Sequence, residues 1–170
     1  EAEIPMPAEQ PQVSWTIADE ATLVDQWRRE HPGQLALLVD GTLSVNAPEA
    51  SAIALATATD ALVIDTALLS AQQDQALASI LSEDGLILHD LKGCIHALGA
   101  RGWTLGKAHT DLLLAAYLVN SEHRGYQLDQ LFARYLGVDS QEKKESTTLF
   151  EVGISDERAQ KLAEDAARMH

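Results

Sequence analysis

The sequence has little cysteine, no long apolar run and no obvious leader. Cys94 is the only cysteine among the 170 residues, so the chain cannot form an internal disulfide or a thiol-based metal cage. The longest uninterrupted apolar run, Leu112 to Val119, is far shorter than the roughly 20 residues that a membrane-spanning helix needs. A basic segment followed by an apolar one, as in an export signal, does not open the sequence. We therefore expect a cytoplasmic protein with no membrane partner.

Basic residues are also scarce. The chain has 12 Lys and Arg residues and 26 Asp and Glu residues, which gives a net charge of −14. This charge opposes unassisted binding to a phosphate backbone. Three cations between residues 85 and 110, Lys92, Arg101 and Lys107, are the candidate contacts for any nucleic acid. They also fit an ordinary solvated surface. A glycine-rich phosphate loop, a Ser-His-Asp pattern and a paired-cysteine motif are all missing.

What is present is enough apolar sequence for one globular domain. Apolar residues make up 46% of the chain and charged residues 22%, which suits a single hydrophobic core. Residues 1–18 contain Pro5, Pro7 and Pro11 and lack sustained periodicity, so they are expected to form a linker. Residues 19–170 are expected to form the domain.

Periodicity and turn residues predict an α/β domain in which helices cover one sheet. Helices are expected over 19–30, 68–80, 90–98, 110–119 and 126–136, and from about 156. Short apolar runs predict strands over 35–39, 52–58, 61–64 and 86–88. The polar segment 141–146 is expected to be a loop.

Three segments, taken in their order along the chain, resemble those of a known family. They are Leu88-His89-Asp90-Leu91-Lys92-Gly93-Cys94, then Thr110 to Ser121 with an apolar helix ending in Asn-Ser, and then Tyr126-Gln127-Leu128-Asp129-Gln130-Leu131. From Leu35 onward the chain resembles the 3′–5′ exonuclease domain of bacterial DNA polymerase I, a family A polymerase.

The resemblance implies a ribonuclease-H-like fold with a mixed five-stranded sheet flanked by helices. It also implies a monomeric fragment of a larger DNA-directed DNA polymerase of replication and repair. The expected partners are the polymerase domain of the same chain and, through the parent enzyme, DNA. The linker then corresponds to the joint from a preceding 5′-nuclease domain.

Phosphodiester hydrolysis by two divalent ions, about 3.5–4 Å apart, requires several carboxylates to hold the ions and offset their charge. In the family an Asp-x-Glu motif supplies two of them, and here it falls on Asp40-Gly41-Thr42. A second motif places Cys94 where the family has an Asp. The third keeps Asp165 but has Lys161 where the family has a tyrosine.

Two of the four implied carboxylates, at Thr42 and Cys94, are therefore replaced. The preferred interpretation is a structural domain inactive in proofreading, with no cofactor. The alternative is a weak Mg²⁺- or Mn²⁺-dependent 3′–5′ exonuclease on single-stranded DNA ends, in which Asp90 or Asp65 helps Asp40 and Asp165.

Taken without the resemblance, these residues have simpler explanations. Asp40 fits a turn after a strand, Asp90 a helix N-cap, Cys94 a core thiol and Asp165 a solvated acid.

Overall fold

The computed structural model describes residues 12–19, 22, 24–138 and 153–170. Within these ranges the chain forms six strands and six helices. The strands are β1 (Ser14–Ile17), β2 (Ala36–Thr42), β3 (Glu49–Ala56), β4 (Asp60–Asp65), β5 (Leu86–Leu88) and β6 (Ala108–Asp111). The helices are α1 (Val24–Glu30), α2 (Ala71–Leu81), α3 (Leu91–Gly99), α4 (Leu112–Val119), α5 (Leu128–Leu136) and α6 (Asp156–Arg168).

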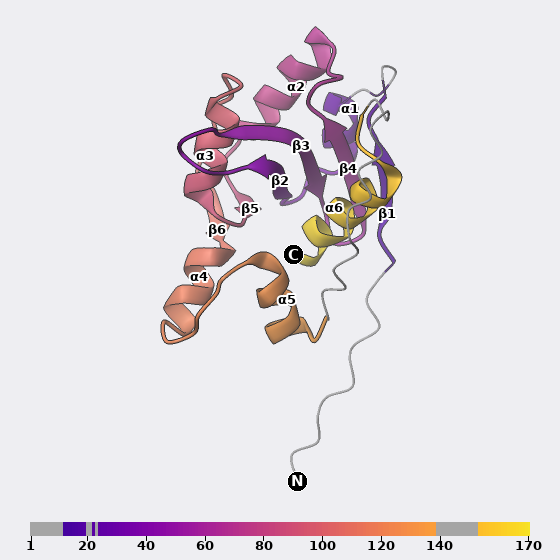
Figure 1. The fold of residues 1–170 in the computed structure, drawn as a ribbon. Helices are drawn as coiled ribbons and strands as arrows, with labels where there is room; N and C mark the ends of the chain where they lie inside the picture. The colour runs from indigo at the N-terminus through magenta and orange to yellow at the C-terminus, as the bar shows by residue number, and fades with distance from the viewer. Residues whose placement is uncertain (1–11, 20–21, 23, 139–152) are drawn as a thin grey trace.

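The strands form one mixed sheet in the order β1-β4-β3-β2-β5-β6. β3 is antiparallel to both of its neighbours, whereas the other pairs are parallel. Figure 1 shows helices packed around this sheet. The expected α/β class and mixed sheet are therefore confirmed, but the sheet has six strands and not five.

The two edge strands, β1 and β6, lie where the sequence predicted a linker and a helix. β1 pairs with β4, and Trp15 and Ile17 pack against apolar residues of the sheet and α6. The expected linker is thus wrong for Ser14–Ile17, because these alternating apolar side chains have a core face to cover. β6 occupies the first two positions of the helix predicted from Thr110, and α4 begins only after it.

The two faces of the sheet carry different cores. On one face large aliphatic side chains of the sheet, such as Leu37 and Leu55, pack with α1, α2 and α3, and Leu77 of α2 belongs to the same core. On the other face α6 packs through small residues, with Ala159, Ala163 and Ala166 fully buried. Small side chains let the helix approach the strands closely, so the side chains along the edge of α6 come within reach of β2.

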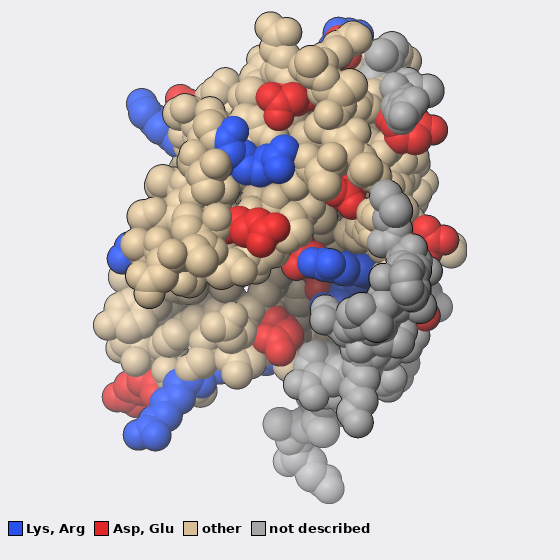
Figure 2. Space-filling model, turned by 45° about the horizontal axis from the view of Figure 1, so that its top comes forward, with Lys and Arg blue, Asp and Glu red and all other residues tan. Residues whose placement is uncertain are grey.

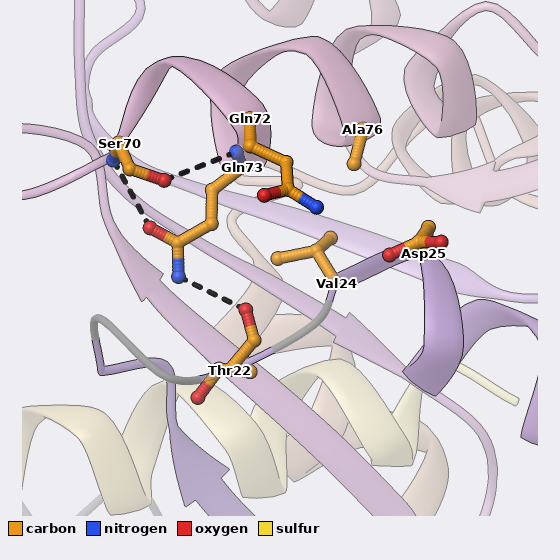
Figure 3. A pocket seen from close by; sticks show the side chains of 7 residues that line it. All are labelled: Thr22, Val24, Asp25, Ser70, Gln72, Gln73 and Ala76. Atoms are coloured by element: carbon orange, nitrogen blue, oxygen red, sulfur yellow. Dashed lines mark hydrogen bonds between the residues drawn. The ribbon is translucent and has the colours of Figure 1, made fainter.

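Several predicted helix ends are confirmed by their caps. Asp90 accepts a hydrogen bond from the Gly93 N–H at the start of α3, and Gly137 ends α5 with a left-handed φ of 66°. α2 starts with a capping box between Ser70 and Gln73. Figure 3 shows Gln73 also donating to the Thr22 carbonyl, across a small hollow between α1 and α2.

The polar segment 141–146 lies outside the described residues. In the ranges that are described, each helix is too short or too polar to cross a membrane.

Candidate functional site

Asp40 lies at the carboxyl end of β2, on the α6 face of the sheet. It sits inside the strand and pairs with Ala52 of β3, so the alternative of a turn after the strand is wrong. A β-bulge follows, in which Ser51 is the extra residue and Gly41 adopts φ 144°. The Asp40 Oδ2 accepts a hydrogen bond from the Arg158 Nε at 2.6 Å, which joins β2 to the first turn of α6.

Arg158 shares this end of the sheet with acidic residues of β3 and β4. It borders a hollow of about 170 Å³ together with Glu49 and Asp65. Glu49 is the direct partner of Thr42 in the β2–β3 ladder, and Asp65 ends β4. The resemblance had implied a metal among carboxylates at this end of β2, and the structure places a guanidinium there. The sequence analysis missed Arg158 and Glu49.

Asp165 lies further along the same side of α6. It is seven residues, or two turns, after Arg158, which corresponds to about 10 Å along the helix axis. Its side chain is only 13% exposed and binds two cations, the Lys161 Nζ at 2.5 Å and the Arg168 Nη1 at 2.8 Å. Asp40 and Asp165 thus lie along one side of α6, and each carboxylate is bound to a basic side chain of that helix.

Cys94 is a packed core thiol, as the simpler explanation expected. It is 1% exposed in the apolar core beneath α3, and its Sγ lies 3.5 Å from the His89 carbonyl oxygen, to which it donates. Burial, followed by the negative charges of Asp90 and Asp111, raises the pKa of Cys94 to about 12. The side chain is therefore a neutral thiol at physiological pH, a poor ligand for Mg²⁺, which prefers oxygen.

Asp90 is confirmed as the N-cap of α3, in a left-handed conformation with φ 60°. Its backbone N–H donates to the Asp111 carboxylate, which also accepts from the N–H groups of Leu91 and Leu113. Asp111 therefore joins the first turns of α3 and α4, a role that the sequence analysis missed. Its place directly before an apolar helix, typical of an N-cap, was the available signal.

The donor set does not fit a pair of divalent ions. Of the four implied ligand positions, Thr42 is a neutral hydroxyl, Cys94 is a neutral thiol, and Asp40 and Asp165 are ion-paired. Among the described residues, no group of three or more His, Cys, Asp or Glu side chains is arranged to hold a metal ion.

The three candidate DNA contacts occupy separate places. Lys92 is in the first turn of α3, beyond the carboxyl end of β5, whereas Lys107 lies beside the amino end, with its carbonyl accepting from Gly85. Arg101 donates to the Thr66 carbonyl at 2.7 Å and stacks over Trp103. Figure 2 shows basic and acidic side chains interspersed on one face, without a continuous basic patch there. A DNA-binding role for these residues stays a prediction.

Comparison with known proteins identifies relatives among DNA polymerases. DNA polymerase I of Mycobacterium tuberculosis is 40% identical over 119 residues, which are 66% of this chain and 13% of the relative. DNA polymerase I of Mycobacterium leprae is 38% identical over 123 residues, 69% of this chain and 14% of the relative. The chain thus spans about one seventh of the length of these relatives. No protein-family model matches it.

Solved structures share the fold. The POL domain of Pol1 from M. smegmatis, in complex with DNA primer-template and dNTP, has a TM-score of 0.73 at 30% identity, over 90% of this chain and 26% of that one. The catalytic core of RRP6 from Trypanosoma brucei has a TM-score of 0.69 at 13% identity, over 95% and 47%. Brucella melitensis NrnC bound to pGG has a TM-score of 0.62 at 18% identity, over 94% and 77%.

The last two likenesses concern the fold alone, whereas the mycobacterial matches extend to sequence. The chain therefore matches DNA polymerase I in sequence, and it shares its fold with all three solved structures. This chain is homologous to part of DNA polymerase I and has the ribonuclease-H-like fold of the 3′–5′ exonucleases.

Proposed function

We propose that this chain is the 3′–5′ exonuclease-like domain of a family A DNA polymerase of replication and repair, and that it is inactive in proofreading. In this proposal the domain is monomeric and cytoplasmic, and it supports the polymerase domain of the same chain, through which it meets DNA. In this proposal the domain includes β1, from Ser14 onward. The observation that carries the proposal is the pairing of both remaining carboxylates with cations of α6.

Electrostatics explains why this pairing opposes metal binding. A divalent ion beside Asp40 or Asp165 must displace Arg158, Lys161 or Arg168, or else remain close to a like charge. The replacement of two acids by Thr42 and Cys94 removes two units of negative charge that would offset the ions. Mg²⁺ demands near-ideal octahedral oxygen coordination, which the remaining set does not supply.

The alternative of a weak metal-dependent exonuclease depends on substitute ligands. Asp65 favours it by position, because this residue borders the same hollow as Arg158. However, the Asp65 Oδ1 already accepts a hydrogen bond from the Ala67 N–H at 2.9 Å. Asp90 uses its Oδ1 to cap α3. Both proposed helpers therefore have structural roles that a metal would disturb.

Calorimetric titration with MnCl₂ tests the proposal directly. We expect no binding by the natural chain at millimolar Mn²⁺. A Thr42→Glu/Cys94→Asp/Arg158→Ala/Lys161→Tyr variant restores the implied motif residues and removes Arg158, so its binding shows that the titration can detect the site. Circular dichroism checks that this variant folds.

If the restored variant does not fold, an Arg158→Ala/Lys161→Ala variant replaces it, because these two side chains are 46% and 67% exposed. Weak binding by this double variant and none by the natural chain supports neutralisation by the cations. Two Mn²⁺ ions bound per natural chain overturn the proposal and favour the exonuclease.

A further inference from the structure

α4 carries an apolar surface that the rest of the described chain does not cover. The helix has no charged residue from Leu112 to Val119, and Ala116 is its one buried residue. Leu114 and Tyr117 are 53% and 48% exposed, and Leu118 and Val119 are both 75% exposed. These four residues are called the α4 apolar surface. Figure 1 shows the helix at the margin of the molecule, beyond the edge strand β6.

The α4 apolar surface differs from ordinary exposed apolar residues. A single exposed leucine needs no explanation, but Leu114, Tyr117 and Leu118 have i, i+3 and i+4 spacing and share one face of the helix. A helix that is apolar all round is normally buried. Grouped exposed apolar side chains of this kind mark interaction sites.

The contacts of α4 within the described chain are few. Asp111, the last residue of β6, caps its first turn, and Tyr117 meets Tyr126 edge-to-face at a centroid distance of 5.7 Å. The Tyr126 hydroxyl donates to the carbonyl of Asn120, which ends the helix. The helix is thus fixed at both ends, so its outer residues form a preorganised surface.

We propose that the α4 apolar surface docks against the polymerase domain of the same chain, an inference that rests on the function proposed above. The relatives support this occupant, because the matched segment is only 13–14% of their length. In the M. smegmatis structure 90% of this chain corresponds to 26% of one larger chain. A segment with this fold therefore has a large covalent neighbour in its relatives.

Charge and size argue against other occupants. A second copy brings another net charge of −14, which repels the first. A nucleic acid needs cations, and α4 has none. Four side chains also fall short of the roughly 800 Å² per partner of a stable intermolecular interface. A tethered neighbour, at an effective concentration in the millimolar range, requires less contact area.

Hydrogen exchange of the α4 amides tests the docking. We expect exchange at least tenfold slower in the full-length polymerase that carries this segment than in the 170-residue chain. A Leu118→Gln/Val119→Gln variant should remove this difference, since both side chains are exposed and the helix itself is retained. Ile95→Gln on α3 is the matched control, because Ile95 is 51% exposed outside the surface, and it should leave the protection unchanged.

Three results would overturn the docking proposal. Equal exchange rates of the α4 amides in the two proteins would show that α4 does not contact the polymerase domain. Concentration-dependent protection in the 170-residue chain, with a dimer in sedimentation, assigns the surface to a second copy. Protection that appears only when DNA is added assigns it to nucleic acid. The Mn²⁺ titration is independent of these outcomes: two bound ions together with α4 protection would refute inactivity and leave the docking intact.

Discussion

The two halves of the site that the resemblance implied differ in their surroundings. On α3 the implied ligand position is occupied by Cys94, which is buried in the aliphatic core and uncharged. Beside α6 the carboxylates of Asp40 and Asp165 remain, but basic side chains of that helix bind them. One half is thus apolar, whereas in the other half basic side chains neutralise the carboxylates.

This difference indicates how reversible each change is. A carboxylate returned to position 94 must be buried in an aliphatic core, which is costly. Arg158 and Lys161 are themselves 46% and 67% exposed, so their removal leaves no cavity in the core. The α3 half should therefore be the main barrier to a restored site, and substitutions there should have the larger effects.

The reactivity of Cys94 should show the largest effect. With a pKa of about 12 against the ordinary 9.0, its thiolate fraction at pH 8 is lower by a factor of about 1,000. We expect iodoacetamide to alkylate the native chain at least that much more slowly than the urea-unfolded chain. The native rate should still rise about tenfold per pH unit from pH 8 to pH 10. A plateau near pH 9 would show an ordinary, accessible thiol and break the comparison.

Cys94→Asp should lower the free energy of unfolding by about 3 kcal/mol at pH 7, because it buries a carboxylate beside Asp90 and Asp111. Burial and these charges hold the pKa of the new carboxyl above its unfolded value near 3.9. The folded state then binds the proton more tightly, so the loss grows as pH rises above 4.

Urea unfolding at pH 7 and pH 4 measures both effects, with Cys94→Ala as the control that removes the thiol without adding charge. The same loss at both pH values would mean that the new carboxyl is solvated. In that case position 94 would accept a charged side chain as readily as the exposed α6 half, and the contrast between the two halves would be lost.

Periodicity, apolar runs and turn residues predicted most of the fold, and the two missed strands have a common cause. The core strands β2 to β5 and the helices α2 to α6 were expected near their observed places, and α1 covers the later part of the helix expected over 19–30. β1 and β6 are four-residue edge strands, and pairing with a neighbour that lies far away in sequence defines them. Four residues carry too little alternation to reveal such a strand.

The candidate site was predictable in part. Asp40, Thr42, Cys94, Lys161 and Asp165 were named from motifs, and the burial of Cys94 followed from its place on an apolar stripe. Arg158 was missed because it lies outside these motifs and reaches Asp40 across 118 positions in sequence. Glu49 was missed because its position opposite Thr42 depends on a β-bulge, which changes the register by one residue.

The ion pairs of α6 should show the smallest effects and sharpen the comparison within that half. In a double-mutant cycle with Asp40→Asn and Arg158→Gln, we expect a coupling of about 0.5 kcal/mol, since the two side chains are 29% and 46% exposed. The corresponding cycle for Asp165 and Arg168 should give about 1 kcal/mol, because these side chains are 13% and 23% exposed. Urea unfolding measures both cycles, and 1 M NaCl should weaken the Asp40 pair more strongly.

A coupling above about 2 kcal/mol for Asp40 and Arg158 would contradict this prediction. It would show that the guanidinium stabilises the fold as strongly as a buried core group, so that the α3 and α6 halves would no longer differ in how readily their side chains can be replaced.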